Sequence, residues 1–234
     1  MNLLAGWSEL GLAVAAFFAS HVVPARPAVR RLLHARLGGA AYAIIYSSVS
    51  LGVLAWLIAA AAHAPYFQLW DFELWQLWIP NIVMPLVCLL IAFGLAAPNP
   101  FSIAGRANER FDPKRPGIAA IARHPLLLAI TLWALAHMVP NGDLAHAMLF
   151  GLFAAFGIAG MAALDGRRRK EWGPRLWAER AAKTSLIPFA AVFQGRVRLS
   201  ELRVDPFRTA SALALYVTLL AAHPLVIGVS PLPR

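Results

Sequence analysis

Six apolar runs alternate with polar segments along the chain. The runs cover residues 3–22, 41–62, 79–97, 124–139, 144–164 and 209–228. A helix of about 20 apolar residues is long enough to cross the hydrocarbon core of a bilayer. The pattern therefore predicts an all-α, polytopic membrane protein. We expect a bundle of about six transmembrane helices that forms a single integral membrane domain over residues 1–234.

The composition agrees with a membrane protein. Of the 234 residues, 60% are hydrophobic and only 14% are charged, whereas a soluble domain is nearer half apolar. The first run has no basic segment before it and no small-residue cleavage pattern after it, so we expect a membrane span rather than a signal peptide. The single cysteine, Cys88, provides no disulfide framework.

Lys and Arg gather in alternate connections between the runs. Four lie in residues 23–40, five in 98–123 and eleven in 165–208, which together make twenty of the twenty-one cations. Cytoplasmic loops of membrane proteins carry such an excess of positive charge. We therefore expect these three connections in the cytoplasm and both termini in the periplasm, as in a multi-pass protein of a bacterial inner membrane. Cations placed between apolar runs do not indicate a nucleic-acid partner.

Two segments predict how the chain is arranged locally. In the fifth run small residues recur every fourth position, a pattern that lets helices approach closely. These residues are Ala147, Gly151, Ala155, Ala159 and Ala163. The segment 184–196 is apolar, too short to span and interrupted by Pro188. It is predicted to lie at the cytoplasmic interface or to be re-entrant.

Histidines are the ionisable residues that enter the apolar runs. No Asp, Glu, Lys or Arg lies in the middle of a run, which argues against an ion-coupled carrier. His21, His124, His137 and His223 do lie within or at the ends of runs. Neutral imidazoles in a dry helical bundle suit axial ligation of haem iron. The alternative for each is a hydrogen bond to a neighbouring main-chain or hydroxyl group.

Several short motifs together identify a known family. The chain contains SHVVPARPAVR, YSSVSL, APYFQLWD, APNP, RHP, LWALAHMVPNGD, TSLIPFAA and AHPL, distributed over nearly its whole length. In this combination it resembles the NnrU family of bacterial membrane proteins. That family is related to the plastid and cyanobacterial 15-cis-zeta-carotene isomerase.

The resemblance implies a cofactor, an activity and a competing role. In the isomerase branch it implies a haem b protein with iron ligands that match His21 and His137. It also implies redox-dependent cis–trans isomerisation of a polyene or other lipophilic substrate. That branch has a cysteine one turn before the second histidine, where this chain has Ala134, so a thiolate ligand is absent. The NnrU branch is tied to nitrite and nitric oxide reduction. The corresponding alternative is a non-catalytic accessory factor with a membrane protein partner.

The predicted topology disagrees with the ligand pair implied by the resemblance. His21 ends the first run near the cytoplasm, whereas His137 lies thirteen residues beyond His124, about 20 Å deeper along a helix. Two axial ligands of one iron lie only about 4 Å apart, because each metal–nitrogen bond is near 2 Å. By depth, His21 pairs with His124 and His137 pairs with His223. We therefore rank His137 first and His21 second, with His223 and His124 as alternative partners.

The RHP motif supports a different alternative. Together with the basic segment 165–188, it resembles the C-terminal half of the isoprenylcysteine and phospholipid methyltransferases. That resemblance implies S-adenosylmethionine, with Arg123 or His124 on the methionine carboxylate and an acidic residue on the ribose. The usual Glu-Glu pair is replaced by Asp165-Gly166, so shared ancestry of the fold explains the motif better than methyl transfer does.

Overall fold

The computed structural model describes residues 3–202 and 204–233, and the chain divides into two compact units. Within the described ranges the regular elements are helices, with one isolated antiparallel bridge between Gln68 and Asp143. The first unit contains residues 1–71 and 141–149, and the second contains residues 72–140 and 150–234. The predicted all-helical fold class is confirmed.

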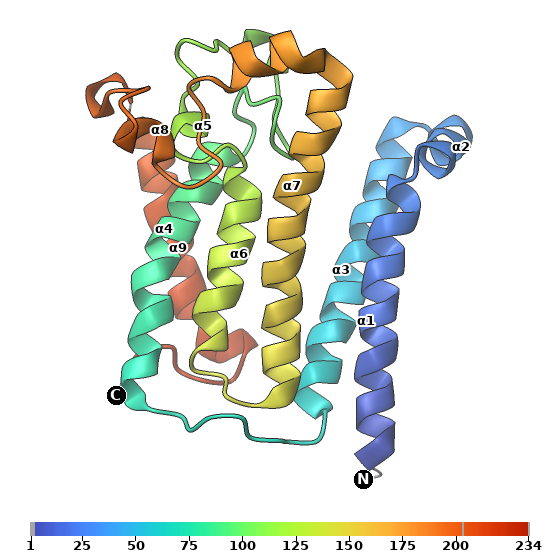
Figure 1. Ribbon diagram of the computed structural model, residues 1–234. Helices are drawn as coiled ribbons and strands as arrows, with labels where there is room; N and C mark the ends of the chain where they lie inside the picture. Colours follow the sequence, from blue (N-terminus) through green and yellow to red (C-terminus); the bar gives the residue numbers. More distant parts are fainter. Residues whose placement is uncertain (1–2, 203, 234) are drawn as a thin grey trace. The chain divides into compact units, whose positions relative to one another are not determined.

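The first unit is a helical hairpin with a short helix at its turn. α1 (Leu3–Ala25) packs along α3 (Gly39–His63), and α2 (Pro27–Leu37) joins them (Figure 1). At the other end of the hairpin Gly6 lies against Pro65, since a Cβ on Gly6 would be 2.7 Å from the Pro65 Cδ.

The helix α2 occupies a connection that sequence patterning treated as a loop. It begins at Pro27, where the missing N–H has no intrahelical partner to lose. It ends at Gly38, whose φ of 76° suits a residue without a Cβ. The sequence did not predict this helix as a membrane span, because Arg30, Arg31 and Arg36 make the segment too polar.

The second unit is built around α4 (Trp78–Gly94), which contacts both α6 (Pro125–Met138) and α9 (Pro206–Val226) (Figure 1). Short elements connect these helices. They are η1 (Leu74–Leu77), η2 (Asn108–Arg110), α5 (Ile118–Ile121), α8 (Ala190–Phe193) and η3 (Leu199–Glu201).

The longest helix, α7 (Leu144–Ala181), begins in the first unit and continues through the second. It extends well beyond the predicted apolar run 144–164 into the basic segment. Gly173 interrupts it with a φ of 74° and a ψ of 169°, and Pro174 follows. The helix therefore bends at this point, as Figure 1 shows near its end. The predicted loop 165–208 thus starts as helix.

Five helical segments of the described chain are long and apolar enough to cross a membrane: α1, α3, η1 with α4, α7 and α9. The sixth apolar run forms α6, which has 14 residues and is therefore about 21 Å long. A bilayer core is about 30 Å thick, so α6 alone is short for a span. The membrane class is supported, whereas the count of six spans and the periplasmic termini stay predictions.

The contact between α6 and α7 does not use the predicted small-residue stripe. Ala155, Ala159 and Ala163 are exposed, and nothing lies within 4 Å of a Cβ added to Gly151. Glycines on another face of α7 approach α6 instead. A Cβ on Gly157 would lie 2.2 Å from the Thr131 Oγ1, and one on Gly160 would lie 3.3 Å from the Leu127 Cδ1. The repeat predicted that α7 packs closely against another helix. The close contact with α6 instead involves Gly157 and Gly160, on a different face of α7.

The segment 184–196 contains α8 and packs against α5. Ser185 and Ala191 are buried, whereas Ile187 and Phe193 are strongly exposed. A short segment with a buried polar side and exposed apolar side chains is consistent with an interfacial position. That position stays a prediction.

Candidate functional site

Three of the motifs, together with an acidic residue of α7, meet at one end of the second unit. APNP contributes Asn99, RHP contributes Arg123 and His124, TSLIP contributes Thr184 and Ser185, and α7 contributes Asp165. Each of these polar residues is at most 8% exposed. We call this group the buried polar cluster. Because its members come from separate loops and helices, folding is required to assemble it.

Asp165 is the centre of the buried polar cluster. Arg123 Nη1 donates to its Oδ2, and His124 Nε2 donates to its Oδ1 over 2.8 Å. Arg123 Nε also donates to the Thr184 Oγ1 over 2.8 Å. Burial lowers the pKa of the Arg123 guanidinium, and the nearby Asp165 carboxylate opposes that change. The ion pair thus joins the start of α6 to α7.

The main chain of Arg123 is held as tightly as its side chain. Its N–H donates to the Ser185 carbonyl over 2.7 Å, and its carbonyl accepts from the Asn99 Nδ2 over 2.9 Å. Ser185 in turn donates from Oγ to the Ala120 carbonyl and accepts from the Ala191 N–H over 2.7 Å. These bonds fix the residue that precedes α6, and Pro125 at the first helical position sets where α6 begins.

Aromatic rings cover the Arg123 guanidinium. Its Cζ lies 5.5 Å from the centroid of Phe101 and 5.2 Å from that of Trp177. The Arg169 Cζ lies 4.8 Å from Trp177, and Trp172 lies 6.1 Å from Trp177, centroid to centroid. These distances fall in the range of cation–π contacts. The rings exclude water from the ion pair and strengthen it.

The His124 ring bonds to a carboxylate through Nε2, unlike the other three candidate ligands, whose Nδ1 bonds to a main-chain carbonyl. A carboxylate only accepts hydrogen bonds, so Nε2 carries the hydrogen that Asp165 receives. The lone pair of the neutral ring is then on Nδ1, which is buried and has no hydrogen-bond partner. His124 therefore serves as a donor within the buried polar cluster.

His137 lies near the other end of α6 among aromatic rings. Its Nδ1 donates to the Trp133 carbonyl over 2.8 Å. Its ring centroid lies 5.4 Å from that of Trp133 and 5.8 Å from that of Phe150. Phe153 completes the group at 5.6 Å from Trp133. The imidazole thus lies in an apolar, aromatic environment with its Nδ1 fixed by the main chain.

His223 and His21 have the same pattern of main-chain bonding. In α9, His223 Nδ1 donates to the Val229 carbonyl over 2.8 Å. In α1 of the first unit, His21 Nδ1 donates to the Phe17 carbonyl over 2.8 Å. The His21 ring also faces Tyr46 at 6.4 Å between centroids.

The structure brings together some predicted residues and adds others. Arg123 and His124 form one site, and His137 and His223 occupy the same unit, while His21 belongs to the other unit. Sequence reasoning did not assign roles to Asn99, Thr184, Ser185 or Trp177. Their signal was present, since Asn99, Thr184 and Ser185 lie in motifs that carried the family resemblance. Among the described residues, no group of three or more His, Cys, Asp or Glu is arranged to hold a bare metal ion.

The long apolar helices, the buried ion pair and the half-buried histidines define a helical membrane protein with an internal polar site. Comparison with known families is more specific. The family described as NnrU protein matches residues 9–231, nearly the whole chain. The chain belongs to the NnrU family.

Two curated relatives carry the same name. The chain is 30% identical over 207 residues to "15-cis-zeta-carotene isomerase, chloroplastic" of Arabidopsis thaliana, covering 83% of this chain and 54% of the relative. It is 28% identical over 206 residues to the protein of that name from Zea mays, covering 81% of this chain and 53% of the relative. The chain thus spans about half the length of these relatives. No solved structure matches the chain significantly.

Proposed function

We propose that the protein is a membrane isomerase that converts a cis double bond of a polyene, or of a similar lipophilic substrate, to trans. The observation that carries this proposal is the similarity to two relatives named 15-cis-zeta-carotene isomerase over more than four fifths of the chain. A helical bundle with long apolar helices suits a substrate that is dissolved in lipid. Because the chain spans only about half the length of these relatives, their activity and substrate are carried over as part of the proposal.

We further propose that haem b is held by His137 and His223. In histidines that ligate metals, the second ring nitrogen commonly donates to a carbonyl or carboxylate, which fixes the orientation of the ring. His137 and His223 both donate from Nδ1 to main-chain carbonyls. Both also lie near the ends of helices in the same unit. Two such imidazoles would provide nitrogen ligands of the type that haem iron takes.

His21 is the competing partner of His137. It has the same Nδ1 bond and matches the ligand of the isomerase branch, but it lies in the other unit. His124 fits less well, because its Nε2 is engaged by Asp165 and its ring is buried in the polar cluster. We therefore rank His223 above His21, and His124 last.

Protein residues would hold the cofactor and shape its surroundings. When bound, haem supplies an iron centre that can exchange one electron, which lowers the barrier to rotation about a conjugated double bond. Trp133, Phe150 and Phe153 provide an apolar wall beside His137 that excludes water. The buried polar cluster fixes the start of α6 and thereby the position of His137 along it.

The contacts of Arg123, His124 and Asp165 in the described part of the chain do not favour the methyltransferase alternative. It would require Arg123 or His124 for the carboxylate of S-adenosylmethionine and an acidic residue for the ribose. Instead, Arg123 uses Nε and Nη1 on Thr184 and Asp165, and both Asp165 oxygens are engaged within the cluster.

An isomerisation assay tests the proposed function. Purified protein supplied with haem is incubated with 15-cis-zeta-carotene under reducing and oxidising conditions, and the isomers are separated by chromatography. We expect redox-dependent formation of the trans product by the wild type and none by His137→Ala. The matched control is His146→Ala, because the His146 ring pairs with the Asp143 carboxylate and is not one of the proposed ligands. Absence of turnover by haem-loaded wild type under both conditions would favour the accessory-factor alternative.

A further inference from the structure

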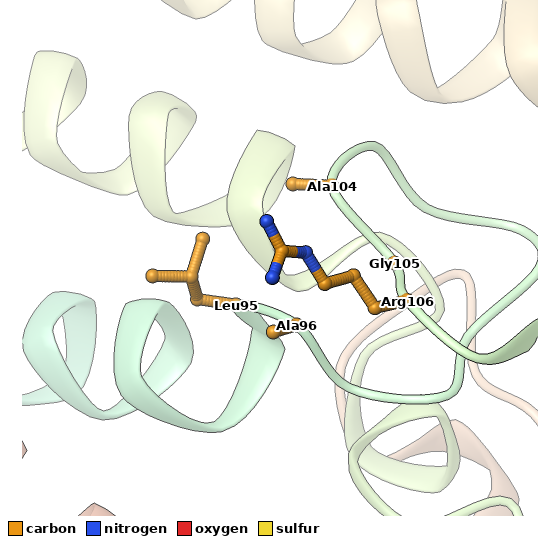
Figure 2. A pocket seen from close by; sticks show the side chains of 5 residues that line it. All are labelled: Leu95, Ala96, Ala104, Gly105 and Arg106. Atoms are coloured by element: carbon orange, nitrogen blue, oxygen red, sulfur yellow. The ribbon is translucent and has the colours of Figure 1, made fainter.

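A pocket of about 450 Å³ opens where α4 ends. It is lined by Leu95, Ala96, Ala104, Gly105 and Arg106. Figure 2 shows Leu95 and Ala96 directly after the helix and the other three on the loop that follows, with the Arg106 side chain extending between Leu95 and Ala104. Its volume lies within the range of small-molecule pockets, about 300–1,000 Å³.

The walls of this pocket are held by an unusual backbone. Ala96 and Ala104 have φ values of 54° and 55°, a left-handed conformation that is strained for residues with a Cβ. The two residues are joined by a hydrogen bond of 3.2 Å from the Ala96 N–H to the Ala104 carbonyl. Gly105 fits tightly, since a Cβ there would lie 2.4 Å from the Asn99 carbonyl oxygen. Such strain tends to occur at ligand-binding loops.

The pocket combines apolar walls with one unpaired positive charge. Within the described chain the Arg106 guanidinium forms no ion pair or side-chain hydrogen bond. The nearby Arg208 is already used, because its Nη1 donates to the carbonyls of Ala92 at 2.6 Å and Leu95 at 3.1 Å. Leu95 is 54% exposed at the mouth. A ligand with an anionic head and an apolar body would satisfy both features.

The position of the pocket indicates where that ligand comes from. The pocket lies at the end of the apolar run 79–97, on the side of the arginine-rich connections. Under the positive-inside rule this is the cytoplasmic interface, where anionic lipid headgroups attract Lys and Arg. The exposed Ile103 adds apolar surface on the same loop.

We propose that this pocket binds an anionic phospholipid of the cytoplasmic leaflet. The phosphate pairs with Arg106, and the first part of an acyl chain contacts Leu95 and Ala104. A free inorganic anion would pair with Arg106 but leave the apolar walls uncovered. A zwitterionic lipid carries its own cation beside the phosphate and gains less. The site is separate from the proposed haem ligands and does not depend on them.

Thermal unfolding of the detergent-purified full chain tests this site, with phosphatidylglycerol, phosphatidylcholine and inorganic phosphate as probes. For the wild type we expect saturable stabilisation by phosphatidylglycerol and none by the other two. Arg106→Gln should weaken the apparent affinity for phosphatidylglycerol about fivefold, since one interfacial cation contributes about 1 kcal/mol. Arg110→Gln removes the same charge from the same loop outside the pocket and should retain the wild-type affinity. Leu95→Ala should also weaken binding, although it changes no charge.

Three results would overturn the proposal. They are an unchanged affinity in Arg106→Gln, equal stabilisation by phosphatidylcholine, and saturable stabilisation by inorganic phosphate alone. Should Arg106→Gln be unstable without lipid, Arg106→Lys provides the second variant, because it keeps the charge. It should bind phosphatidylglycerol with at most a small loss, and loss of binding as large as that expected for the glutamine variant would also contradict the proposal.

Discussion

Removing the charge of Asp165 should destabilise the protein more than any surface substitution. Asp165→Asn leaves the Arg123 guanidinium buried without its counter-ion, and Arg123 is only 8% exposed. Breaking a buried pair in this way costs about 3–5 kcal/mol. For a chain of this size, where 1 kcal/mol shifts Tm by about 2–4 °C, Tm should fall by roughly 6–20 °C.

The assay is thermal unfolding in detergent, followed by tryptophan fluorescence. Trp177, one of eight tryptophans, contributes a signal from the cluster itself, because its ring lies 5.2 Å from the Arg123 Cζ. The control is Asp112→Asn, which breaks an exposed, solvent-screened pair with Arg115 and should change Tm little. The double variant Arg123→Met with Asp165→Leu removes both charges and should recover much of the loss. Equal Tm values for Asp165→Asn and Asp112→Asn would refute the reasoning.

Two other predictions test helix packing and topology. Gly157→Ala should destabilise the protein by about 1–3 kcal/mol, because its Cβ would lie 2.2 Å from the Thr131 Oγ1. The Cβ in Gly151→Ala meets open space, so this variant should change stability by less than about 1 kcal/mol. Comparable Tm losses in the two variants would contradict the packing described for α7. A periplasm-dependent reporter fused after Arg234 should be active, since the charge pattern places both termini outside, and activity of a cytoplasm-dependent reporter there would reverse the topology.

The helical fold was predictable because hydrophobicity is a local property of the sequence. Each of the six apolar runs lies within or largely overlaps a helix, and the boundaries differ by a few residues except in α7. That helix continues beyond the apolar run because charged residues also favour helix. It bends at Gly173 and then continues to Ala181. The helix α2 was not predicted, because the prediction relied on long apolar runs and this helix contains several arginines.

Contacts between distant segments were less predictable. The small-residue repeat indicated a closely packed α7, but the face that meets α6 depends on the side chains of α6, and Gly157 provides the contact. The buried polar cluster was predictable only in part. The methyltransferase resemblance grouped Arg123, His124 and Asp165 around a cofactor, but nothing in the sequence indicated that they bond directly to one another. The family motifs marked several of its members without showing that they meet.

We propose that His137 and His223 hold a haem in the second unit. The most direct measurement is the haem-to-protein ratio, with the absorption spectrum, of the detergent-purified wild type and three variants: His137→Ala, His223→Ala and His21→Ala. We expect a Soret band in the wild type and in His21→Ala, and loss of bound haem in the other two without loss of the fold. A full haem complement with an unchanged spectrum in His137→Ala would contradict the claim. Loss in His137→Ala and His21→Ala, with retention in His223→Ala, would replace His223 by His21 as the partner.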